Sequence, residues 1–109
     1  MRRMGWVIGL EPGMVETYRR LHAAVWPDIL ALIGACNIRN YTIFLREPEN
    51  LLFGTWDYHG TDFAADMARM EADATNAAWW RLTIPCQRPL ESRSSGEWWA
   101  PMEEVFHCD

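Results

Sequence analysis

Tyr18, His22 and Trp26 recur at four-residue steps along the segment VETYRRLHAAVWPDILALI, residues Val15 to Ile33. In an α-helix this spacing places all three side chains on one side. The imidazole of His22, whose ordinary pKa lies near neutrality, can move a proton in either direction. A lone histidine in an apolar helical stripe is more commonly a core residue, so both a catalytic and a structural role stay open.

Four further residues complete the candidate pocket: Asn40, Tyr41, Trp79 and Trp80. Aromatic faces pack on the apolar face of a sugar ring, while tyrosine hydroxyls, indole N–H groups and amides bond its hydroxyls. Two adjacent tryptophans cannot both face the core of one helix, which favours a cavity-lining position for one of the pair. Tyr18 and Trp26, taken alone, are equally consistent with a packed core.

Other classes of site lack their characteristic residues. The sequence has no paired carboxylates of the glycosidase type, no glycine loop for phosphate and no cluster with metal-ligand spacing. Cys36, Cys86 and Cys108 are widely separated, which argues against a zinc site and predicts small buried thiols. We therefore expect no metal and no cofactor. With no secretion signal or long apolar run, we also expect no membrane insertion and a cytoplasmic, reduced chain.

The charge and composition narrow the partners. The 109 residues carry a formal net charge of −5, and arginine rather than lysine supplies every positive charge. An acidic chain without a basic stripe is a poor candidate for nucleic-acid binding, because phosphate neutralisation supplies most of that affinity. Seven tryptophans are an excess that suggests a ligand pocket or a large interface. The length predicts a single domain over residues 1–109.

The elements that must position these residues follow from hydrophobic periodicity and turn residues. Strands are predicted at residues 4–10, 37–47, 51–60 and 102–107, and residues 88–96 read as a loop. Helices are predicted at residues 15–33, interrupted or restarted at Pro27 and capped by Gly34, then at 62–72 and 73–86. Thr61 or Asp62 is expected to cap the second of these helices.

This order is that of a ferredoxin-like split β-α-β subunit, an α+β fold with helices on one face of an antiparallel sheet. A chain of this length has no second layer to cover the other face. We therefore expect a homodimer.

The chain resembles the L-rhamnose mutarotase family over nearly its full length. The resemblance is carried by YRRLHAAVWPDI (18–29), NYTIFL (40–45), ENLLF (49–53), WW (79–80) and MEEVFH (102–107). It implies a dimeric α+β barrel that interconverts the α and β anomers of a 6-deoxy-hexopyranose without a cofactor. It also implies that His22 is the proton donor, and that the sugar is contacted by Tyr18, Tyr41, Trp79 and Trp80.

Several positions depart from the family pattern and bear on the choice of sugar. Leu21 stands where an arginine is expected, His107 replaces an expected tyrosine, and the pair Trp98-Trp99 is unusual. We expect L-rhamnose as the first substrate and L-fucose as the next. As a hypothesis, His22 acts as general acid toward the ring oxygen, with Tyr18, Tyr41 or water taking the proton of the anomeric hydroxyl.

Two alternatives remain at this point. The first is a cofactor-free oxygenase that acts on an aromatic substrate in the same dimeric barrel. The second is a ligand-sensing dimer without catalytic activity, in which His22 is only a core residue.

Overall fold

The computed structural model describes all residues from Met1 to Asp109. Its strands are β1 (Arg2–Leu10), β2 (Ile38–Arg46), β3 (Leu51–Tyr58), β4 (Gln87–Arg88) and β5 (Ala100–Met102). Its helices are α1 (Val15–Ala23), α2 (Pro27–Ala35), α3 (Phe63–Ala72) and α4 (Ala74–Thr83). Two single 3₁₀ turns, η1 (Pro12–Met14) and η2 (Ile84–Cys86), precede α1 and follow α4. None of these helices is long and apolar enough to cross a bilayer.

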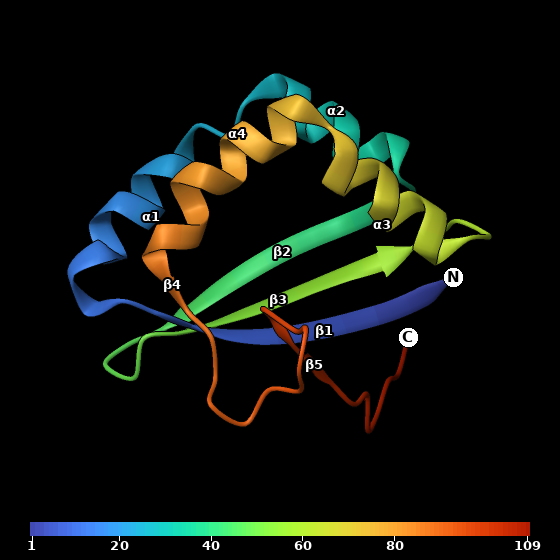
Figure 1. The fold of residues 1–109 in the computed structure, drawn as a ribbon. Helices are drawn as coiled ribbons and strands as arrows, with labels where there is room; N and C mark the ends of the chain where they lie inside the picture. The colour runs from blue at the N-terminus through green and yellow to red at the C-terminus, as the bar shows by residue number, and fades with distance from the viewer.

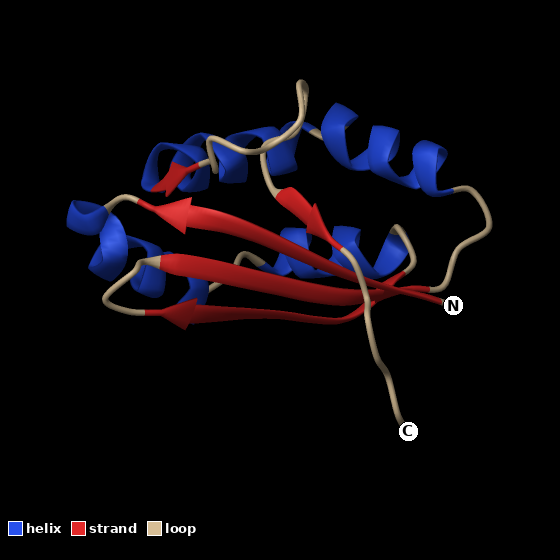
Figure 2. Ribbon diagram, turned by 90° about the horizontal axis from the view of Figure 1, so that it is seen from below, coloured by secondary structure: helices blue, strands red, loops and turns tan.

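The sheet has the strand order β2-β3-β1-β4, and every pairing is antiparallel. The short strand β5 also pairs with β1, at Gly5 to Val7, next to the residues that pair with β4. All four α-helices lie over one face of the curved sheet (Figure 1). Seen from the opposite side, no helix lies in front of the long strands, and the C-terminal segment runs away from them (Figure 2). The predicted α+β, ferredoxin-like arrangement is confirmed.

The side chains of the long strands alternate between these two faces, as the period of a β-strand requires. Ile8 and Leu52 belong to the core that packs against α1, so their neighbours Val7 and Phe53 face away from the helices. Phe53 pairs across the sheet with Phe44, which is 60% exposed. We call Val7, Phe44 and Phe53 the open apolar face.

Most predicted boundaries of the first helices and strands agree with the structure. Pro27 opens α2 directly after Trp26, which confirms the expected restart, because proline fits the first turn of a helix. The Asp62 side chain caps α3 by accepting from the Ala65 N–H at 3.1 Å. The expected cap at Gly34 is wrong. The helix continues to Ala35, and the chain reverses at Asn37, whose φ is 66°.

The C-terminal part differs more. The strand predicted at residues 102–107 is wrong, because β5 ends at Met102, and Val105 and Phe106 are 86% and 81% exposed. The two-residue strand β4 was not predicted. It forms because Gly9 of β1 has no side chain: a Cβ there would lie 2.5 Å from the Arg88 carbonyl oxygen. Glycine thus permits a close backbone approach.

Two buried clusters hold the helices to the sheet. One joins β1, α1 and β3, and contains Ile8, Leu10, Val15, Tyr18, Leu52 and Cys86. The other anchors α2 and α3, and contains Leu32, Cys36, Ile38 and Met70. Cys36 and Cys86 are buried as predicted, whereas Cys108 is exposed near the C-terminus, where no core reaches it.

Candidate active site

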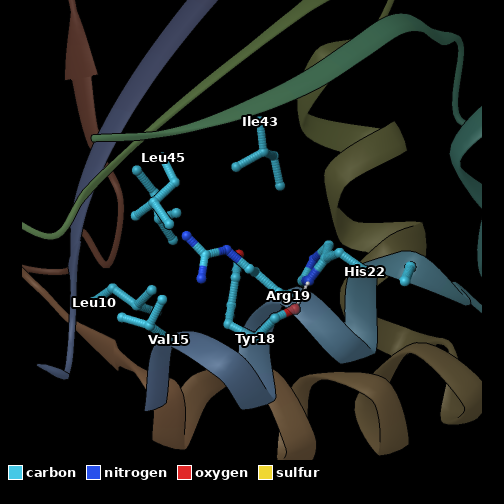
Figure 3. Close-up of a pocket in the computed structure, with 9 residues that line it drawn as sticks. Leu10, Val15, Tyr18, Arg19, His22, Ile43 and Leu45 are labelled. Carbon is cyan, nitrogen blue, oxygen red and sulfur yellow. Dashed lines mark hydrogen bonds between the residues drawn. The ribbon is translucent and has the colours of Figure 1, made fainter. Parts of the chain in front are cut away.

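A cavity of about 310 Å³ lies between α1 and the helix-covered face of the sheet. Its walls come from β1, α1, β2 and β3, and Figure 3 shows its side chains converging from the helix and the strands. Seven of its nine lining residues are apolar in character, and the lining includes both candidate residues Tyr18 and His22. The full lining is Leu10, Val15, Tyr18, Arg19, His22, Ala23, Ile43, Leu45 and Leu52.

His22 is oriented by a hydrogen bond within its own helix. Its Nδ1 atom lies 3.0 Å from the carbonyl oxygen of Tyr18, one turn earlier. Because a carbonyl oxygen can only accept, Nδ1 carries the proton of the neutral ring, and Nε2 keeps a free lone pair. Burial lowers the pKa of His22, and the bond to the Tyr18 carbonyl only partly opposes that effect. The neutral ring with a basic Nε2 is therefore the resting form at neutral pH.

Aromatic rings hold the imidazole on both sides. The Tyr18 ring stacks on it at 4.2 Å between centroids and an angle of 29°, as the four-residue spacing predicts. Trp79 of α4 meets it edge-on at 5.5 Å, and Trp26 packs on Trp79 at 5.2 Å. Trp79 is buried and packs on His22 from outside the cavity, while Trp80 is half-buried. Neither Trp26, Trp79 nor Trp80 lines the cavity itself.

The Tyr18 hydroxyl is a protonated donor within the site. Burial is the main cause that raises the pKa of Tyr18 to about 12, against a smaller lowering by a hydrogen bond from Gln87. The Gln87 amide Nε2 donates to the Tyr18 oxygen at 3.3 Å, and the Gln87 oxygen accepts from the Trp98 indole Nε1 at 2.7 Å. Tyr18 thus accepts from the protein and keeps its own proton to donate.

Tyr41 lies on the same side of the sheet. Its ring meets Trp56 edge-on at 5.0 Å. The residue is 39% exposed over its whole surface, yet its hydroxyl is enclosed, and this burial together with the neighbouring Tyr18 phenol raises the pKa of Tyr41. Tyr41 is not among the residues that line the cavity. The structure therefore places it beside the site rather than within its walls.

Asn40 lies apart from the other candidates. It has a φ of 53°, at an irregularity in the pairing of β2 with β3, and its amide donates to Asp57 at 2.9 Å. Asp57 in turn lies 3.5 Å from Arg3. Asn40 is exposed and does not line the cavity, because the extra residue in β2 turns its side chain to Asp57.

Several lining residues were not predicted from the sequence. Arg19 extends from α1 toward Leu45 (Figure 3), and its guanidinium bonds both Glu16 and Glu47. Its position three residues before His22 was a signal that could have identified it. Ile43 and Leu45 alternate on β2 and supply the aliphatic wall opposite the helix. Gln87 does not line the cavity but bonds Tyr18, and it gave no signal because it lies in a two-residue strand.

The other two histidines lie outside the cavity. His59 is exposed after β3, and His107 is exposed near the C-terminus, where its Nε2 lies 2.8 Å from Asp109. No group of three or more His, Cys, Asp or Glu side chains is arranged to hold a metal ion.

Comparison with known proteins identifies relatives over the whole chain. A family model described as L-rhamnose mutarotase matches residues 3–108. L-rhamnose mutarotases from Sinorhizobium fredii and Mesorhizobium japonicum are 32% and 34% identical, and the matches cover 98% and 90% of this chain and 98% and 89% of theirs. That of Oceanobacillus iheyensis is 28% identical with full coverage of both chains.

Two solved structures share the fold. One is an L-rhamnose mutarotase from Formosa agariphila, with a TM-score of 0.78, 21% identity and full coverage of both chains. The other is the tetracenomycin F2 cyclase of Streptomyces glaucescens, with a TM-score of 0.73, 12% identity and coverage of 100% of this chain and 98% of that one. At these identities the likeness shows the fold alone. On the family match over residues 3–108, together with relatives above 30% identity, this chain belongs to the L-rhamnose mutarotase family, whose members are carbohydrate isomerases.

Proposed function

We propose that this protein interconverts the α and β anomers of L-rhamnose, with Nε2 of His22 as the atom that moves the proton of the C1 hydroxyl. The observation that carries the proposal is the hydrogen bond from Nδ1 to the Tyr18 carbonyl, which leaves Nε2 basic in a largely apolar cavity. A base with a pKa near the working pH is suited to such a transfer.

Ring opening needs two proton transfers at neighbouring oxygens. Nε2 of His22 takes the proton of the C1 hydroxyl, while the Tyr18 hydroxyl gives its proton to the ring oxygen as the bond from C1 to that oxygen breaks. The aldehyde group of the open chain then rotates. On closure from the other face, the C5 hydroxyl returns a proton to Tyr18, and His22 returns its proton to the former aldehyde oxygen.

This order assigns His22 the base role in ring opening. The expectation that His22 donates to the ring oxygen instead requires its doubly protonated form, which the lowered pKa makes scarce at neutral pH. Tyr18 suits the donor role because its raised pKa keeps the hydroxyl protonated. The pH dependence of the rate distinguishes the two orders.

The cavity suits a monosaccharide with an apolar substituent. Its volume of about 310 Å³ is at the small end of ligand pockets. The aliphatic side chains of Ile43, Leu45 and Leu52 offer a surface for the C6 methyl of a 6-deoxy sugar, while Arg19 can donate to sugar hydroxyls. L-Rhamnose is therefore the proposed substrate, and L-fucose the next to test.

We propose further that the protein acts as a homodimer in which each chain forms a single domain over residues 1–109. The support is the open apolar face, where Phe44 of β2 is 60% exposed beside Phe53 of β3. A second copy that packs its own open face there would remove both surfaces from water and form the dimeric barrel. The exposed Val105 and Phe106 could then pack on the partner.

Exchange spectroscopy by NMR on the two anomeric protons of L-rhamnose tests the activity directly. We expect cross-peaks between the α and β signals in the presence of micromolar protein, and none at the same mixing time without it. The same measurement on L-fucose defines the range of sugars. An unchanged exchange rate with folded protein would contradict the proposal.

A thermal-shift panel addresses the other functions that the sequence left open. Stabilisation by 6-deoxy sugars alone supports the mutarotase. Stabilisation by polycyclic aromatic compounds alone would instead favour the oxygenase, and stabilisation by neither class would favour the sensing dimer.

A further inference from the structure

We propose that Gln87 and Trp98 form a positioning relay that directs the Tyr18 hydroxyl proton toward the sugar and supports the charge that remains when this proton leaves. The relay rests on the proposed function, in which Tyr18 donates to the ring oxygen. It gives a role to a tryptophan of the unusual Trp98-Trp99 pair and to a buried amide that the sequence did not identify.

The first step fixes the orientation of the Gln87 amide. An indole N–H is a donor only, so the atom it meets at 2.7 Å must be the Gln87 carbonyl oxygen rather than the amide nitrogen. The amide oxygen and nitrogen of glutamine are chemically distinct but similar in shape, and a neighbouring donor selects between them. Trp98 therefore turns the Gln87 NH₂ group toward Tyr18.

The second step fixes the direction of the Tyr18 proton. The Gln87 Nε2 atom lies 3.3 Å from the Tyr18 oxygen and can only donate to it. Gln87 is only 8% exposed and Tyr18 only 6% exposed, so bulk water does not compete at this contact. No protein atom accepts a hydrogen bond from the Tyr18 hydroxyl, and Tyr18 lines the cavity. The hydroxyl proton is thus free for an oxygen of the bound sugar.

The third step concerns charge. As Tyr18 gives up its proton, its oxygen becomes negative, and the Gln87 N–H already aimed at it stabilises that charge without reorganisation. The bond from Trp98 to the Gln87 oxygen polarises the amide and strengthens its N–H as a donor. The bond from Gln87 lowers the pKa of Tyr18, in the direction that this role requires, although burial has the larger effect.

The fold holds both positioning residues in place. Gln87 opens β4 and pairs with Leu10 of β1, while Trp98 lies two residues before β5, which pairs with β1 farther along. Both residues are therefore held next to the same central strand. Their eleven-residue separation in the sequence is closed by the pairing of β4 and β5 with β1.

Anomer exchange in a double-mutant cycle tests the relay. Trp98→Phe keeps an aromatic ring but removes the N–H. We expect the maximal rate to fall about 5- to 10-fold, the usual span for one hydrogen bond, with a smaller change in KM. In a Tyr18→Phe background, Trp98→Phe should cause no further loss, because the hydroxyl it orients is gone. Trp99→Phe is the matched control for packing, since Trp99 packs near Gly54 and against the same core cluster as Tyr18 but joins no hydrogen bond of the relay.

Gln87→Glu supplies a second variant with its own pH response. As a carboxylate, Glu can only accept, so it would take the Tyr18 proton away from the sugar and oppose charge on the phenol oxygen. When protonated, it can again donate to Tyr18 while it accepts from Trp98. We therefore expect the ratio of the variant's rate to the wild-type rate to rise as pH falls from 8 to 5. Taking this ratio removes the shared titration of His22.

A readout without catalysis separates this inference from the proposed function. The side-chain amide resonances of Gln87 should shift more in both Trp98→Phe and Tyr18→Phe than in Trp99→Phe, which changes packing but breaks no hydrogen bond to Gln87. Coupled losses, the pH-dependent ratio and these shifts support the relay. Equal losses from Trp98→Phe in both backgrounds, a flat ratio for Gln87→Glu, or unmoved Gln87 resonances would overturn it. A wild type that exchanges no anomers, yet shows both shifts, would overturn the proposed function and leave the hydrogen-bonded chain standing.

Discussion

Nδ1 of His22 lies 3.0 Å from the carbonyl oxygen of Tyr18, while the rings of the same two residues stack at 4.2 Å. One pair thus fixes both the tautomer of the imidazole and the orientation of its plane. Because Trp79 closes the other edge at 5.5 Å, His22 has little freedom to rotate. Nε2 is thus held at the cavity by a backbone carbonyl rather than by a charged partner, which is one of the common ways to fix the tautomer of a histidine.

Replacement of His22 by asparagine is expected to remove most of the catalysis. The amide keeps some hydrogen-bonding capacity but cannot exchange a proton near neutral pH. General acid–base catalysis contributes about 10²- to 10⁴-fold, so the anomer exchange rate should fall by a factor in that range. Exchange spectroscopy measures the rate, and thermal unfolding shows whether the variant is folded.

His59→Asn is the matched control, because His59 is exposed and lies outside the cavity. Its exchange rate should equal that of the wild type. A folded His22→Asn protein with full activity would contradict the assignment of His22 to proton transfer and would make it a structural residue.

The rate should rise with pH through the pKa of His22, which burial sets below the ordinary 6.5. The basic ring is the working form in ring opening, so protonation removes activity. The other ionised group of the cavity, Arg19, stays charged throughout this range and is bonded to Glu16 and Glu47. Exchange rates measured across this pH range check the direction. A rate that instead falls as pH rises would assign the acid role to His22.

Local signals were sufficient to predict the long elements and the centre of the site. Pro27 opens a helix and Asp62 caps one, because both effects depend on residues within a single turn. The four-residue step from Tyr18 to His22 likewise required only helical geometry. Ile43 and Leu45 were not predicted to line the site, although their alternation on β2 was a local signal that could have identified the opposite wall.

The parts that could not be predicted depend on contacts between distant segments. Gln87 enters the site because β4 packs against Gly9, and nothing near Gln87 in the sequence reports that approach. Asn40 leaves the site because an irregularity between Arg39 and Thr42 interrupts the alternation of β2. Regular alternation from the buried Ile38 would have placed Asn40 on the helix-covered face and Tyr41 on the other, whereas the extra residue turns Asn40 away and brings Tyr41 to the helix-covered face.

Gly9→Ala should destabilise the protein through this contact. The new Cβ would lie 2.5 Å from the Arg88 carbonyl oxygen, and a backbone atom cannot move aside as a flexible side chain can. Such overpacking costs about 1–3 kcal/mol, measurable as a lower free energy of unfolding in urea.

Gly34→Ala is the control, with an expected effect of the opposite sign. Gly34 lies within α2, and a Cβ added there would meet no atom within 4 Å, so this change should stabilise by about 1 kcal/mol. Equal effects at both positions would contradict the close-contact argument.

Phe44→Asp should separate the proposed dimer. In the wild type, light scattering should give about twice the subunit mass of 12.7 kDa. Phe44 is 60% exposed on the open apolar face, and a buried, unpaired carboxylate there would oppose association. Leu30→Asp is a close control, since Leu30 is 58% exposed but lies on α2. A wild type that is a folded monomer, or dissociation by Leu30→Asp alone, would contradict the proposed interface.

The aliphatic wall should make the enzyme discriminate at C6 of the sugar. L-Mannose carries a hydroxyl at C6, where L-rhamnose has only a methyl, and a hydroxyl placed against Ile43, Leu45 and Leu52 would lose its hydrogen bonds to water. Differences of this size in an apolar pocket change kcat/KM by about 10- to 200-fold, so L-rhamnose should be exchanged faster than L-mannose by a factor in that range. Leu45→Asn, which has a similar branched shape but can bond a hydroxyl, should narrow the ratio by slowing L-rhamnose more than L-mannose. Leu82→Asn, at a position 44% exposed on α4, should leave it unchanged. Parallel exchange measurements on both sugars give the ratio for each variant. Equal rates on the two sugars with the wild type would show that C6 does not contact this wall.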